Sequence, residues 1–206
     1  MPTALHLKFF SLSPKLLRLV MIGAAFHSQP LAAQVVKLKA LPIIAEEVNA
    51  YVPAAIGFSV EQAFKEVNSM EFSYELYYRA NSWPGDGNYS GQRINLAYKR
   101  YFGAHSSYQG FLLSPHISYL ATSVPEYDEP LVSLRKGAST GFGAGLNLGR
   151  QWLLGERVTL VGIEAGTTFY RSYLQRKWED SSSEAYYDNH WDYNLSFSLG
   201  VLIYKG

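Results

Sequence analysis

Apolar and polar residues alternate along most of the chain after residue 34. The last segment shows this most clearly, and its apolar positions are Tyr193, Leu195, Phe197, Leu199, Val201 and Ile203. The positions between them are polar or small, and they are Asn194, Ser196, Ser198 and Gly200. Side chains two residues apart lie on one face of a β-strand, so the alternation predicts a strand with one apolar and one polar face.

The same period of two recurs in eight segments, which we interpret as eight strands. They lie near residues 35–45, 54–64, 69–80, 92–102, 109–121, 138–152, 157–173 and 192–205. The connections alternate between long and short. The long ones are 46–53, 81–91, 122–137 and 174–191, and the short ones are 65–68, 103–108 and 153–156. Long loops at one end and tight turns at the other favour an all-β fold, an eight-stranded antiparallel up-and-down transmembrane β-barrel.

The two faces differ in a way that indicates which one points inward. The polar face carries small residues beside charges, whereas the apolar face is rich in Phe, Tyr and Leu. An eight-stranded barrel has little interior room, which suits the small residues. A buried charge without a partner costs several kcal/mol, so inward charges are expected to pair in a closed network that fills the lumen. The inward charged residues are Lys37, Lys39, Glu61, Glu71, Glu75, Arg79, Arg93, Lys99 and Glu164. A path for protons or ions is the alternative.

Aromatic residues gather near the predicted strand ends, which is typical of the two interfacial girdles of a membrane barrel. The turn-side group is Tyr98, Tyr101, Phe102 and Trp152. The loop-side group is Tyr119, Phe169, Tyr170, Tyr173, Trp191 and Tyr193. A secreted soluble barrel that binds a ligand remains an alternative, because each strand signal is weak when taken alone.

Residues 1–33 have the features of a secretory signal peptide. Basic residues precede a short apolar stretch at 19–26, and small residues follow at Ala32 and Ala33. The barrel is therefore expected to span 34–206; an uncleaved membrane anchor is the alternative.

The chain has no Cys, which excludes disulfides, zinc-thiolate sites and thiol catalysis. Its net charge of +1 excludes an electrostatic nucleic-acid binder.

Several short motifs resemble a known family. They are Val36-Lys37-Leu38-Lys39, Gly57-Phe58-Ser59-Val60-Glu61, Arg100-Tyr101-Phe102, the run from Gly110 to Pro115, the run from Gly141 to Gly145, and the closing strand from Leu195 to Tyr204. Through them the chain from Val35 to Gly206 resembles the small bacterial outer-membrane barrels catalogued as domain of unknown function 3575. More distantly it is similar to the membrane barrel of OmpA-type porins. The resemblance implies a Gram-negative cell outer membrane, contact with its lipid and lipopolysaccharide, and insertion by the barrel-assembly machinery. It implies no activity.

Two patterns suggest chemistry. His116 and Ser118 share a strand face, and the pair is similar to the His-x-Ser pair of outer-membrane lipid A deacylases; a His beside a Ser can activate it as a nucleophile. Both side chains are predicted to point inward, which disfavours an enzyme acting on acyl chains; a lipid-A-modifying hydrolase therefore stays an alternative. An acidic loop is predicted from Glu179, Asp180, Glu184, Asp188, His190 and Asp192. It lacks the spacing of a calcium loop and is expected to be solvated; a divalent-cation bridge to lipopolysaccharide is the alternative.

Glycines at 141, 143, 145 and 149 follow the period of two, so we expect the crowded side of a strand and no phosphate loop. No motif for a metal, a nucleotide or another cofactor is found, so none is expected. The sequence thus predicts an integral outer-membrane barrel with a filled lumen and a structural role, or a surface-interaction role through the loops 81–91, 122–137 and 174–191.

Overall fold

The computed structural model describes residues 34–42, 54–79, 89–103, 108–124, 127–129, 132–154, 159–178 and 183–203. The predicted signal peptide at 1–33 and the predicted loop at 46–53 lie outside these residues. Every regular element in the described ranges is a β-strand, which confirms the all-β fold class. A search of the same ranges for a helix long and apolar enough to cross a membrane finds none.

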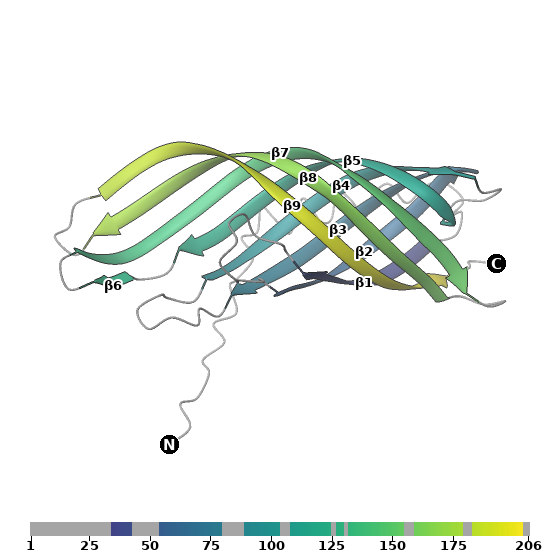
Figure 1. The fold of residues 1–206 in the computed structure, drawn as a ribbon, viewed down its shortest axis with the longest axis horizontal. Coiled ribbons are helices and arrows are strands. Elements are labelled where there is room, and N and C mark those ends of the chain that lie inside the picture. The colour runs from purple at the N-terminus through teal and green to yellow at the C-terminus, as the bar shows by residue number, and fades with distance from the viewer. Residues whose placement is uncertain are drawn as a thin grey trace, which may run out of the picture. The chain divides into compact units, whose positions relative to one another are not determined.

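The described chain forms nine strands (Figure 1). They are β1 Gln34–Pro42, β2 Ala54–Lys65, β3 Asn68–Arg79, β4 Tyr89–Phe102, β5 Gly110–Val124, β6 Tyr127–Glu129, β7 Val132–Leu154, β8 Thr159–Trp178 and β9 Ser183–Ile203. Each strand of the main sheet pairs antiparallel with its neighbour in sequence, except that β5 pairs with β7 and β6 pairs only with β7. The pairing of β1 with β9 closes eight strands into a hydrogen-bonded ring, as predicted.

The last three strands of the ring are longer than the sequence pattern predicted. β7, β8 and β9 have 23, 20 and 21 residues, whereas β1 has 9 and β5 has 15. They therefore extend beyond the other strands at the end away from the short turns (Figure 1). The predicted loop at 174–191 is wrong for most of its length, because β8 continues to Trp178 and β9 begins at Ser183. The predicted loop at 122–137 likewise contains β6 and the start of β7.

Cross-strand aromatic contacts help to explain why the pairing of β8 with β9 continues into the predicted loop at 174–191. The rings of Tyr173 and Tyr187 lie 5.3 Å apart across β8 and β9, and Phe169 and Trp191 lie 5.0 Å apart. Such pairs stabilise neighbouring strands directly. Tyrosines at consecutive positions blur the alternation of apolar and polar residues, so the pattern alone ended these strands too early.

The faces of the strands have the predicted orientation. On β9, Leu199 is 56% exposed on the outer side of the ring, whereas Ser198 is 6% exposed on the inner side. The glycines of β7 lie on the crowded inner side, as expected. A Cβ atom at Gly143 would lie 2.7 Å from Cδ1 of Tyr170, so the absence of a side chain makes room for that ring.

A small apolar cluster occupies the interior at the turn end of the ring. It consists of Val35, Ala63, Tyr108, Leu160 and Leu202, all buried. Tyr108 comes from the connection before β5 and has a left-handed backbone, with φ of 76°. Its hydroxyl accepts a hydrogen bond from the backbone N of Ala63 at 2.7 Å, which fixes the ring inside the cluster.

Candidate functional site in the ring interior

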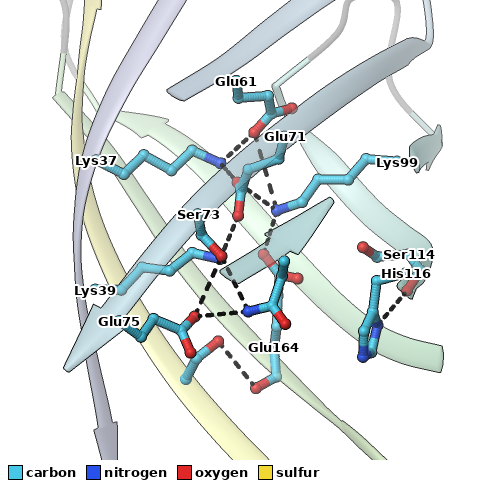
Figure 2. Close-up of polar contacts among 12 residues, drawn as sticks. Lys37, Lys39, Glu61, Glu71, Ser73, Glu75, Lys99, Ser114, His116 and Glu164 are labelled. Atoms are coloured by element: carbon cyan, nitrogen blue, oxygen red, sulfur yellow. Dashed lines mark hydrogen bonds and ion pairs between the residues drawn. The ribbon is translucent and has the colours of Figure 1, made fainter. Parts of the chain in front are cut away.

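The most distinctive feature of the ring is a group of buried charges next to the apolar cluster. Lys37 and Lys39 come from β1, Glu61 from β2, Glu71 from β3, Lys99 from β4 and Glu164 from β8. All six point inward, because the strand period of two places them on the inner face. None is more than 8% exposed. Figure 2 shows the lysine and glutamate side chains converging inside the ring.

Glu71 is the centre of this group, which we call the ionic layer. One of its carboxylate oxygens lies 2.9 Å from Nζ of Lys37 and 2.9 Å from Nζ of Lys99, and the other contacts Lys39. Glu61 pairs with Lys37 and lies 3.9 Å from Nζ of Lys99. Lys99 also reaches across the ring to Glu164 on β8. Three lysines and three glutamates thus form one connected network with no net charge.

Neutral side chains complete the hydrogen bonding of the ionic layer. Ser69 and Tyr101 each donate a hydrogen bond to Glu61. Gln151 accepts from Lys37 Nζ at 2.8 Å, and its Nε2 donates to the Tyr101 hydroxyl at 2.8 Å. Nε2 also lies 3.3 Å from the backbone carbonyl of Tyr108, so Gln151 links the ionic layer to the apolar cluster below it.

Tyr101 was predicted to lie in the outer turn-side girdle, and its role as a donor to Glu61 was not predicted. That placement is wrong, because Tyr101 is 2% exposed and faces inward. Tyr101 lies two and four residues after Lys99 and Ala97 on β4, so the period of two already indicated that its side chain points inward. The same error affects Tyr170, which is fully buried inside the ring, on the parity of Thr168 and Ser172 on β8.

Two other predicted residues, Glu75 and Arg93, form a further ion pair. The Arg93 guanidinium donates to one Glu75 oxygen, from Nε at 2.6 Å and from Nη2 at 2.5 Å. The other Glu75 oxygen accepts from Asn95 Nδ2 at 3.2 Å. Arg79 lies at the end of β3, but its side chain is outside the described residues, so its part in the network stays a prediction.

A small cavity lies beside the ionic layer and the Glu75–Arg93 pair. Charged residues of both signs line it, together with polar and small side chains such as Ser114, Asn147 and Ser196. The Ser114 hydroxyl is buried and has no hydrogen-bond partner within the described residues. The space is sufficient for a water molecule and far too small for an organic ligand.

His116 and Ser118 both lie inside the ring, and each has a different partner. His116 Nε2 lies 2.8 Å from the Thr168 hydroxyl, whereas the Ser118 hydroxyl lies 2.6 Å from that of Tyr170. No hydrogen bond joins His116 to Ser118 in the described part of the chain. The described geometry therefore does not activate Ser118 through His116, as a nucleophile would require.

The acidic stretch is also placed differently from the prediction, since Glu184, Asp188 and Asp192 lie on β9. His190, on the same strand, stacks on the buried Tyr170 ring at 5.5 Å, with an interplanar angle of 19°. Its Nδ1 lies 3.5 Å from an Asp188 oxygen. Within the described ranges no group of three or more His, Cys, Asp or Glu residues could hold a metal ion.

Comparison of the chain with protein-family models and with curated proteins finds no match. The resemblance to the small outer-membrane barrels therefore rests on the short motifs and on the closed antiparallel ring of eight strands.

Proposed function

We propose that the protein is an integral outer-membrane β-barrel with a filled lumen, which serves as an envelope scaffold and presents its long strand ends for surface interactions. The proposal rests on a distribution of side chains that is inverted relative to that of a water-soluble protein. Large apolar residues cover the outside, with Phe142 73% exposed and Ile56 70% exposed, while Lys37 and Glu61 are fully buried inside. In water such an arrangement would leave a continuous apolar surface exposed, whereas in lipid the same surface is solvated.

The height of the apolar surface supports a membrane setting. On β9 the outward positions from Tyr193 to Ile203 are all apolar or aromatic. These ten residue steps span about 25 Å along the barrel axis, at about 3.3 Å per residue and a strand tilt of about 40°. The outward apolar band of outer-membrane barrels is also about 25 Å tall.

The interior supports a closed scaffold more than a pore. The apolar cluster at the turn end and the ionic layer above it both occupy the cross-section of a ring that has room only for side chains. On this proposal the partners are outer-membrane lipid, lipopolysaccharide and, during insertion, the barrel-assembly machinery. The extension of β7, β8 and β9 beyond the other strands provides the surface for any further partner.

Two experiments test the proposal. Envelope fractions are extracted with alkaline carbonate and then with detergent, and the detergent fraction is run on a gel with and without boiling. A membrane barrel resists carbonate and changes mobility on boiling, whereas a soluble ligand-carrying barrel is released without detergent and contradicts the membrane assignment. The purified protein is then recorded in planar bilayers, where steady ohmic openings of porin size would contradict the filled lumen.

A further inference from the structure

Two arginines interrupt the apolar outer surface near the turn end of the ring. Arg100 on β4 and Arg150 on β7 are both exposed on the outward side, on either side of β5. Arg100 pairs with Leu113, and Arg150 pairs with Phe111 one outward position further along β5. With strands about 4.8 Å apart and about 3.3 Å per residue, their Cα atoms lie about 12 Å apart.

Aromatic rings hold both guanidinium groups at the outer surface. The Arg150 guanidinium lies 4.7 Å from the centre of the Phe111 ring and 5.2 Å from that of Trp152. The Arg100 guanidinium lies 5.7 Å from the centre of the Phe102 ring. Such contacts position a cation over an aromatic face without neutralising its charge.

These two cations differ from the cations inside the ring. Lys37, Lys39 and Lys99 each contact at least one carboxylate. In the ranges that the structure covers, Arg100 and Arg150 make no ion pair and no hydrogen bond to another residue. A guanidinium on an apolar surface needs an anionic or strongly hydrogen-bonding partner. The described residues do not supply that partner, so a group from the surroundings is a candidate for it.

The location of the pair identifies the chemistry of that partner. Each guanidinium contacts a ring two residues nearer the turn end of its own strand, Phe102 on β4 and Trp152 on β7. Both side chains therefore extend toward the turn end of the apolar surface, which on the membrane proposal adjoins the lipid head groups of one leaflet. Guanidinium groups bind phosphate through paired, planar hydrogen bonds. Two arginines without an ion-pair partner among the described residues favour a head group with a net negative charge over a zwitterionic one, which carries its own cation.

We propose that Arg100 and Arg150, with Phe102, Phe111 and Trp152, form a binding site for an anionic phospholipid on the outer face of β4, β5 and β7. This inference rests on the proposed membrane location. We call these five residues the arginine patch. The acyl chains of the bound phospholipid would lie along the apolar outer surface of β5, where Phe111 and Ile117 are 59% and 61% exposed.

The test uses the full-length mature protein folded in a neutral detergent, with native mass spectrometry of bound lipid. Phosphatidylglycerol is the anionic probe, and phosphatidylcholine with the same acyl chains is the zwitterionic control. We expect the wild-type protein to retain phosphatidylglycerol at least fivefold more strongly. The double variant Arg100→Gln/Arg150→Gln should lose this preference. The control variant Arg171→Gln removes an outward arginine of β8 far from the turn end, and it should keep the preference.

Equal retention of the two lipids by the wild-type protein would overturn the lipid site, and so would a double variant with an unchanged preference. Mobility on an unboiled gel shows whether each variant is folded. If the double variant does not fold, the single variant Arg150→Gln and the salt dependence of phosphatidylglycerol retention by the wild type replace it. A salt-independent preference would then overturn the site.

Flotation with vesicles separates this inference from the membrane proposal. A protein that floats with neither phosphatidylcholine nor phosphatidylglycerol vesicles contradicts membrane insertion itself. A protein that floats with both but shows no lipid preference contradicts only the arginine patch.

Discussion

Replacing Glu71 with Gln is the sharpest test of the ionic layer. The two side chains have nearly the same volume, so the substitution leaves no cavity and changes only the charge. Glu71 contacts Lys37, Lys39 and Lys99, and it is the only carboxylate in an ion pair with Lys39 within the described residues. Glu71→Gln therefore leaves the interior with one excess positive charge and Lys39 without its ion-pair partner.

The expected loss of stability follows from the burial of the group. Glu71 is 1% exposed and Lys39 is 8% exposed, so water screens the stranded charge only weakly. Removing one partner of a buried ion pair costs on the order of 3–5 kcal/mol. Lys37 keeps its ion pair with Glu61, and Lys99 keeps its ion pair with Glu164, so these two lysines contribute less to the cost. The total loss in the free energy of unfolding should therefore stay near the lower end of that range.

The measurement is urea unfolding of the protein in lipid vesicles, followed by tryptophan fluorescence and by the fraction of unboiled protein with folded mobility. The matched control is the double variant Lys39→Met/Glu71→Gln, which removes the stranded charge together with its partner. It should recover much of the lost free energy of unfolding, because the remaining network is neutral again. A loss below about 1 kcal/mol for Glu71→Gln would refute a buried, tightly paired layer, since exposed ion pairs have that magnitude.

Three further substitutions test other parts of the fold. Leu199→Arg should destabilise the inserted protein by about 2–4 kcal/mol in vesicle unfolding, because an arginine near the midplane contacts lipid; normal insertion would contradict the assigned outer face. Tyr101→Phe should cost about 1–2 kcal/mol in the same assay, because it leaves Glu61 without one buried donor. Gly143→Leu should abolish the folded gel mobility, since its Cβ would collide with the Tyr170 ring; an unchanged mobility would contradict the close approach of β7 and β8.

The strand faces could be predicted from the sequence because a strand has a side-chain period of two. A shift by one residue would exchange the two faces, so alternation over one segment fixes the orientation of every side chain in it. For this reason Leu199 and Ser198 were assigned to the correct sides. The inward direction of Lys37, Lys39 and Glu61 follows from the same parity.

The partners within the ionic layer could not be predicted in the same way. Lys99 on β4 meets Glu164 on β8, and the two strands are not neighbours in the ring. Their contact depends on ring closure and on the stagger of several strands, and the alternation of residues along one strand does not determine either. Tyr101 and Tyr170 show the opposite failure. Their parity indicated an inward position, but the general tendency of aromatic residues to form outer girdles was given more weight.

The ionic layer also explains how the shortest strand of the ring is held in place. Within the described residues, β1 has nine residues and pairs with β9 from Gln34 to Ala40, so this part of the seam has few backbone hydrogen bonds. The same strand contributes two of the three lysines, Lys37 and Lys39, which bind carboxylates of β2 and β3. On its inner side β1 adds Val35 to the apolar cluster. In the proposed membrane setting its outer side contributes little, because lipid would solvate that side as well as a neighbouring strand would. Two other contacts cross the ring: Lys99 on β4 binds Glu164 on β8, and Lys37 on β1 donates a hydrogen bond to Gln151 on β7. Each joins strands that an open sheet would hold apart, so these two contacts favour the closed ring over an open sheet.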